Sequence, residues 1–226
     1  MAQAAPVQIG NLPLPLAATQ TLPDGVQVYA YNGNLFMLDA TGTSWQLNAP
    51  RGDVLPGDQN LTEWNYDPAA ANATGTTLTN GTVFLQRINV RAPMTITKVW
   101  AHLTNAAVTP TAGQSAVGLY NSAGTLLSGS ADTGTALSGS AGAISMSLST
   151  PQNVGAGFYW VALLGNAATA AKLTASVNGA ANANVGLSAA AFRFCVNGTS
   201  QTSLPSTITP SSNTATGAQT FWVGVS

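Results

Sequence analysis

The residues that could carry acid–base or metal chemistry are few in this sequence. His102 is the only histidine and Cys195 the only cysteine, so a multi-histidine metal site or a zinc–thiolate site cannot form within one chain. His102 lies on a predicted strand, and we expect a structural or surface residue rather than a catalytic one. Because Cys195 stands between Phe194 and Val196, we expect a small buried hydrophobic residue rather than a reactive thiol.

Four of the seven acidic residues gather in one part of the chain, where Asp53 and Asp58 are followed by Glu63 and Asp67. Such carboxylates could bind calcium or form the acid–base pair of a glycosidase. Asp53 and Asp58 also flank Pro56–Gly57, so turn formation explains them equally well. We favour turn residues and keep calcium binding as an alternative. No catalytic residue, metal ligand or cofactor is predicted.

Two further pairs of residues could bind ligands. Arg87 and Arg91 lie on one face of a predicted strand, where they could pair with acidic groups across an interface or simply face solvent. Trp64 and Tyr66 alternate on another predicted strand. If exposed, their rings would form a platform for sugars; if buried, they belong to a core, which we favour.

Two familiar kinds of motif, the serine-hydrolase elbow and the glycine-rich phosphate-binding loop, are not found. No Gly-x-Ser-x-Gly motif accompanies the serines, which argues against a serine hydrolase. The glycine-rich stretch 128–134 contains no lysine and is predicted to be a loop that opens no helix, so it does not indicate phosphate binding.

The composition indicates a rigid β-protein with little surface charge. Charged residues make up 6% of the 226 residues, against roughly 25% in an average domain, and the net charge is −1. Nucleic-acid binding is therefore disfavoured. Five tryptophans and many aliphatic residues argue against disorder. No apolar stretch approaches the roughly 20 residues of a membrane span, and residues 1–6 do not resemble an export signal.

The densest apolar run, residues 157–164, is predicted to be the central strand. It is rich in aromatic and β-branched residues and stops at Gly165, which is typical of a strand buried on both faces. Tyr159, Val161 and Leu163 would point to one side, and Phe158, Trp160, Ala162 and Leu164 to the other.

Short strand candidates separated by turn residues extend over the rest of the chain. They are residues 61–66, 82–91, 94–104, 115–120, 125–128, 143–149, 157–165, 171–177, 189–196 and 219–225. Three of them (144–148, 173–177 and 221–225) alternate, which predicts one face on a core and one in water. The segments 166–171 and 178–191 are predicted to hold at most one helical turn each. The expected fold is all-β, an antiparallel sandwich of the jelly-roll type.

The N-terminal part differs in character. Residues 1–25 form a proline-rich extended arm, residues 26–48 a β-hairpin meander centred on Asn32–Gly33, and residues 49–60 a linker to the sandwich at 61–226. Such a meander is too small to be stable alone, so we expect it to anchor the chain to other subunits or a particle. The expected anchoring residues are Val7, Ile9, Leu12, Leu14, Leu16, Tyr29, Tyr31, Phe36 and Trp45.

The ordered segments 117–127, 144–148 and 156–163 resemble β-sandwich domains in structural proteins of bacteriophages that infect actinobacteria, of the minor tail, fibre or capsid-decoration type. The resemblance covers residues 61–226 and implies a virion protein, often trimeric, with no chemistry of its own. The meander is similar to hairpin modules that precede fibre domains in phage appendages.

We therefore expect a non-enzymatic structural component on a virion surface, assembled in the host cytoplasm and released by lysis. Its partners would be itself, as a homotrimer, and other capsid or tail proteins, without membrane insertion. The alternative is a carbohydrate-binding module that recognises host glycans. A polysaccharide-degrading enzyme is a third interpretation, disfavoured by the few acid–base residues.

Overall fold

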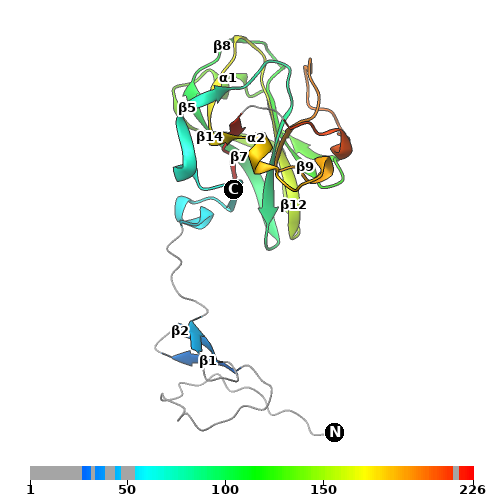
Figure 1. The fold of residues 1–226 in the computed structure, drawn as a ribbon. Coiled ribbons are helices and arrows are strands. Elements are labelled where there is room, and N and C mark those ends of the chain that lie inside the picture. Colours follow the sequence, from blue (N-terminus) through cyan, green and yellow to red (C-terminus); the bar gives the residue numbers. More distant parts are fainter. Residues whose placement is uncertain (1–26, 32–33, 39–43, 47–53, 216–218) are drawn as a thin grey trace, which may run out of the picture. The chain divides into compact units, whose positions relative to one another are not determined.

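The computed structural model describes residues 27–31, 34–38, 44–46, 54–215 and 219–226. The chain divides into two compact units, residues 1–53 and 54–226, and each is described by itself (Figure 1). This division falls inside the predicted linker. Residues 54–60 belong to the larger unit, where the 3-10 helix η1 (Pro56–Gln59) is followed by a hydrogen bond from the Leu61 amide to the carbonyl oxygen of Pro56.

The smaller unit contains a three-stranded antiparallel meander, as predicted. Its strands pair in chain order: β1 (Gln27–Tyr31), β2 (Asn34–Leu38) and β3 (Ser44–Gln46). The register places Tyr29 opposite Phe36, and Met37 opposite Trp45. The meander therefore holds four of the expected anchoring residues, Tyr29, Tyr31, Phe36 and Trp45.

The larger unit is built on two sheets. The five-stranded sheet has the order β10 (Leu126–Gly129), β9 (Ala116–Asn121), β12 (Gly157–Leu164), β6 (Phe84–Val90) and β15 (Phe194–Val196). The seven-stranded sheet has the order β16 (Gln219–Phe221), β14 (Lys172–Gly179), β7 (Met94–Asn105), β17 (Gly224–Val225) and β4 (Glu63–Trp64). Strand β11 (Gly142–Val154) pairs with β7, and β5 (Ala71–Thr77) pairs with β14.

Two short strands, β8 (Val108–Pro110) and β13 (Ala167–Thr169), form a separate small sheet. Within the described part of the chain every strand pairing is antiparallel. The expected all-β sandwich is confirmed.

The space between the two large sheets is filled by one apolar cluster, the inner core. Its members come from alternate positions of the strands and include Phe84, Ile88, Ile96, Leu103, Leu163, Leu173 and Phe221. The rings of Phe84 and Phe221, one from each sheet, meet edge to face with their centres 4.9 Å apart. Strand alternation thus supplies both sides of this core.

A second apolar cluster, the outer core, lies on the opposite face of the five-stranded sheet. It consists of Val83, Leu85, Tyr120, Trp160, Ala162, Leu164, Cys195 and Ile208. Within the described part of the chain no second sheet covers it; instead Phe192 and Leu204, from the loop-rich segment 187–215, pack against it. Gly118 on β9 permits this approach, because a Cβ there would lie 2.7 Å from a methyl of Leu204.

Strand β12 is buried on both faces, as the sequence predicts. It occupies the middle of the five-stranded sheet. Val161 and Leu163 belong to the inner core, against which Tyr159 packs, whereas Trp160 and Leu164 belong to the outer core. Trp160 has no exposed surface. The chain is therefore packed on both sides of one strand.

The alternation predicted for three half-buried strands is right for one of them and only partly right for the other two. Residues 144–148 follow it, with Met146 and Leu148 buried and the serines exposed. On β14, Leu173 and Ala175 are buried but Val177 is 63% exposed, because the pairing of β14 shifts register on either side of Ala175.

Residues 221–225 are buried on both faces rather than one. Phe221, Val223 and Val225 face the inner core, as expected. The other face does not reach water, because Leu61 packs over Gly224 and Asn65 pairs with the backbone of Phe221 and Val223. The segment predicted as a strand over 61–66 is ordered mainly by these contacts, and only Glu63–Trp64 is a strand.

Other predicted elements differ in detail. Strand β5 was not predicted. Within 166–171 the chain forms β13 instead of a helical turn. The predicted strand 189–196 begins with the 3-10 helix η3 (Ala189–Ala191). One helical turn, α2 (Ala180–Ala183), lies within 178–191 as allowed. The stretch 128–134 does open a helical turn, α1 (Gly134–Leu137), contrary to expectation. Two 3-10 helices complete the fold: η2 (Pro68–Ala70) and η4 (Pro210–Ser212).

Candidate binding groove

A surface groove of the larger unit brings together Tyr66 and Arg193, which are far apart in the sequence. Its volume is about 280 Å³, and its lining includes Tyr66, Ser176, Val177, Asn182, Arg193 and Thr220. The walls come from the segment after β4, the end of β14, the turn α2 and the start of β15. Only the sandwich topology places these segments next to one another.

The ring of Tyr66 is held in place on one wall of the groove. Its hydroxyl donates a 3.0 Å hydrogen bond to the carbonyl oxygen of Thr220, and its own carbonyl accepts one from Trp222 Nε1. The ring meets Phe194 edge to face at 6.3 Å. Burial raises the pKa of the Tyr66 hydroxyl, which therefore stays protonated. Tyr66 is half-buried, part core and part groove wall.

Trp64, the other residue of the predicted platform, lies outside the lining of this groove. It is half-buried on β4, opposite Gly224, which in turn lies opposite Trp100 on β7. The space above Gly224 is filled by Leu61, since a Cβ at Gly224 would lie 2.8 Å from a Leu61 methyl. The structure therefore does not bring Trp64 and Tyr66 into one groove.

Arg193 was not singled out from the sequence, yet it forms the charged part of the groove wall. Its position is set by the buried side chain of Asn184, whose Oδ1 accepts hydrogen bonds from the amides of Arg193 and Phe194 and whose Nδ2 donates to the Phe194 carbonyl. The guanidinium lies over the Phe194 ring at 5.3 Å and donates a long bond of 3.5 Å to the Asn65 carbonyl.

Arg87 supplies a second guanidinium near the first. It is half-buried on the outer face of β6, lies over the Phe158 ring at 5.3 Å, and donates from Nη1 to the carbonyl of Ala191. Its Nε is buried and has no hydrogen-bond partner among the residues that the structure describes. Burial lowers the pKa of Arg87, and the like charge of Arg193 lowers it further.

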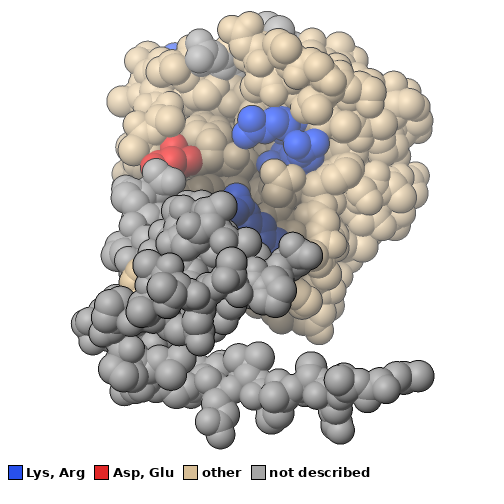
Figure 2. All heavy atoms as spheres, turned by 60° about the horizontal axis from the view of Figure 1, so that its bottom comes forward, with Lys and Arg blue, Asp and Glu red and all other residues tan. Residues whose placement is uncertain are grey.

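Arg91, the other member of the predicted arginine pair, is exposed just beyond β6. Its charge acts on Glu63, whose pKa is nonetheless raised because burial outweighs the amide of Trp64 and the charge of Arg91. Figure 2 shows Lys and Arg side chains gathered near the middle of one face of the larger unit, with acidic side chains to one side.

The single histidine lies on the surface and the single cysteine is buried. His102 is exposed on β7, and its Nδ1 lies 2.8 Å from Thr174 Oγ1. Cys195 lies in the outer core and is 3% exposed, and burial raises the pKa of its thiol to about 12. A thiol held in this neutral form is a poor nucleophile.

The described carboxylates organise turns. Asp58 accepts from the Leu55 amide and Asp67 from the Ala69 amide. Asp132 accepts from the amides of Gly113, Gly134 and Ser115, and these bonds hold its pKa below its usual range. Asp53 lies outside the described residues. Among the residues that are described, no three His, Cys, Asp or Glu side chains lie close enough to share a metal ion.

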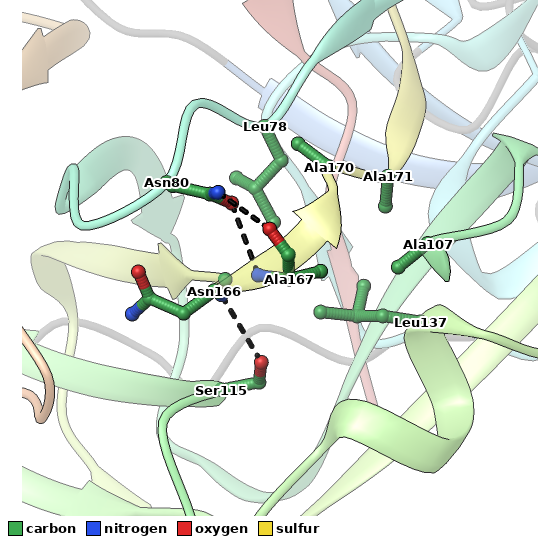
Figure 3. Close-up of a pocket in the computed structure, with 10 residues that line it drawn as sticks. Leu78, Asn80, Ala107, Ser115, Leu137, Asn166, Ala167, Ala170 and Ala171 are labelled. Carbon is green, nitrogen blue, oxygen red and sulfur yellow. Dashed lines mark hydrogen bonds between the residues drawn. The ribbon is translucent and has the colours of Figure 1, made fainter. Parts of the chain in front are cut away.

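Two other hollows carry no ionisable side chain. A cavity of about 10 Å³ lies among Leu78, Ala107, Leu137 and Ala171, with Asn80 and Ser115 at its edge (Figure 3). Those two polar groups already bond to Ala167 and Asn166, and the volume is close to that of one water molecule. An open hollow of about 430 Å³ lies where the ends of β7 and β11 meet, around Met94 and Asn153.

No protein-family model matches the chain, and no curated protein sequence matches it. Among the described residues, no helix has the length and apolar character needed to span a bilayer. Of the expected anchoring residues, Val7, Ile9, Leu12, Leu14 and Leu16 lie outside the described part of the chain.

Proposed function

We propose that the protein is a non-enzymatic structural component of a bacteriophage virion, exposed on the particle surface as a capsid-decoration, head-fibre or minor tail protein. The N-terminal unit attaches it to capsid or tail proteins, and the sandwich projects outward. The chain acts as a homotrimer that is assembled in the host cytoplasm and released by lysis.

The observation that carries this proposal is the contrast between the two compact units. The larger unit has an apolar core on each face of β12, and its own side chains form both cores. The described part of the smaller unit is a meander of three short strands, and so few residues do not bury enough apolar surface to form a core of their own. A second subunit or the particle supplies that surface. The likeness of residues 61–226 to phage sandwich domains gives the setting.

The test is attachment of the full chain to virus particles, measured by co-sedimentation and by imaging with an antibody against the sandwich. Phe36→Asp, in the middle strand of the meander, should abolish both attachment and oligomer formation in light scattering. Val108→Asp introduces the same charge at a 56% exposed position of the sandwich and should leave both intact. A wild-type chain that is strictly monomeric and does not attach would refute the proposal.

A second candidate function is carbohydrate binding by the sandwich, favoured by the groove at Tyr66 and Arg193. The groove combines a fixed aromatic residue with hydrogen-bonding side chains, which is a common composition of sugar-binding sites. The two functions are compatible, because attachment would use one unit and recognition the other.

A further inference from the structure

We propose that the groove between Tyr66 and Arg193 binds a saccharide that carries a carboxylate, with Arg193 contacting the carboxylate and Tyr66 the sugar ring. This inference deepens the carbohydrate-binding function and rests on it, but it is independent of the structural role in the virion.

The first step is the unused donor capacity of Arg193. A guanidinium has five N–H donors in a fork that matches the two oxygens of a carboxylate. For Arg193 the structure gives one side-chain hydrogen bond, the long contact to Asn65, and a ring contact with Phe194. Over the described residues, no acidic side chain forms an ion pair with Arg193 or Arg87. The charge of Arg193 is therefore available to a ligand.

The second step is the unbalanced positive charge around the groove. Arg87 and Arg193 are close enough to repel each other, and one N–H of Arg87 is buried with no partner in the described part of the chain. Residues 54–226 contain five Lys or Arg and four Asp or Glu, and among the described acids Glu63 is influenced by Arg91 rather than by this pair. An anion beside Arg193 would offset this repulsion at short range, where screening by salt is weak.

The third step identifies the neutral part of the ligand. Next to Arg193 the groove is lined by Tyr66, whose hydroxyl is fixed by its bond to Thr220, and by the exposed side chain of Asn182. An aromatic ring flanked by amide and hydroxyl groups suits a sugar, which has apolar C–H faces and hydroxyl edges. The volume of about 280 Å³ lies just below the roughly 300–1,000 Å³ of sites for drug-sized ligands, so one sugar unit would enter.

Calorimetric titration of the full chain tests this inference, with polygalacturonate, alginate and hyaluronate as acidic probes. Galacturonic acid and galactose form a matched pair that differs in the carboxylate alone. We expect the acidic polymers to bind, galacturonic acid to bind more tightly than galactose, and saturation-transfer NMR to place the sugar protons against a tyrosine ring.

Arg193→Ala should weaken binding of the acidic polymers by about 10-fold or more, because a charge-assisted hydrogen bond is lost. Arg193→Lys should recover only part of it, since an ammonium lacks the fork geometry. Lys172→Ala, which removes the same charge from an exposed position at the other end of β14, should change nothing.

Failure of all three acidic polymers to bind would overturn the inference, as would equal losses in Arg193→Ala and Lys172→Ala. Equally tight binding of polyglutamate would assign the groove to an acidic protein segment instead. A chain that attaches to particles but binds none of these saccharides would leave the structural proposal standing and remove only this one.

Discussion

The two faces of the five-stranded sheet are covered in different ways. The inner core lies between two sheets, and its apolar side chains come from alternating strand positions on both sides. The outer core is covered by the segment 187–215, which contains only the three-residue strand β15 and two 3-10 helices. One face is therefore closed by regular secondary structure and the other by irregular chain.

The segment 187–215, here called the cover, is held in place by polar side chains in a way that the inner core is not. Trp160 Nε1 donates a 3.0 Å hydrogen bond to the Phe192 carbonyl, and the Tyr120 hydroxyl donates to the Pro205 carbonyl. Asn197 donates to Thr209 and Asn213. Buried side chains of the sheet thus satisfy part of the backbone of this segment, which outside β15 has only the isolated bridges Thr125–Thr207 and Val196–Thr214. We infer that the outer core is closed by a few replaceable bonds.

The largest effect should come from the inner core. Phe221→Ala removes a fully buried ring and its contact with Phe84, and we expect a loss of about 3–5 kcal/mol in the free energy of unfolding by denaturant titration. Val177→Ala, at a 63% exposed position, should change it by less than about 0.5 kcal/mol. Similar losses in the two variants would contradict the assignment of Phe221 to the inner core.

A smaller loss is expected when the outer core loses one bond. Trp160→Phe keeps an aromatic ring but leaves the Phe192 carbonyl without its donor and a gap beside Phe158, so we expect a loss of about 2 kcal/mol. Near-UV circular dichroism should report the lost packing, because Trp160 is fully buried. An unchanged unfolding free energy would mean that the cover does not depend on this bond.

The reactivity of Cys195 can separate opening of the cover from global unfolding. Tyr120→Phe and Ile88→Val should each cost about 1 kcal/mol, the first in the outer core and the second in the inner core. If the cover opens locally, Tyr120→Phe should speed thiol labelling about 5-fold and Ile88→Val should not. Because the chain has one cysteine, the signal is unambiguous. Equal acceleration would mean that the two cores open together.

The outer core should also make the protein sensitive to alkali. The pKa of Cys195 is raised from 9.0 to about 12, so the stability it contributes is complete below pH 9 and falls as the pH rises toward 12. The fall should be roughly 1 kcal/mol per pH unit, and burial of Tyr120, which also raises its pKa, adds to it above pH 10. Cys195→Ala should reduce the slope of unfolding free energy between pH 9 and 10; an identical slope would rule out the thiol as its source.

Much of the inner core could be predicted from the sequence, because the period of two along a strand is a local property. The ten predicted strand segments each overlap a strand of the structure, and the two-faced burial of β12 follows from its unbroken apolar run. The exposure of Val177 could not be predicted, because a register shift in β14 leaves no mark in the local pattern.

The outer core and the groove could not be predicted, because they depend on pairings across long stretches of chain. Asn184 looks like any loop asparagine until its side chain is seen bonded to Arg193 and Phe194. Tyr66 was singled out for its ring, but its partner Arg193 lies in a segment with no periodicity. In the sequence, the one hint was that Arg193 stands among apolar residues.

The position of β17 has a consequence for how the protein is made. This strand lies inside the seven-stranded sheet, between β7 and β4, and Ser226 adds backbone bonds to Lys98 and Thr97. Until residues 224–226 have left the ribosome, the edge of β7 that they occupy stays open and β4 has no neighbour to pair with. Nascent chains that lack residues 224–226 should stay sensitive to protease, because the sandwich cannot mature until β17 has been translated.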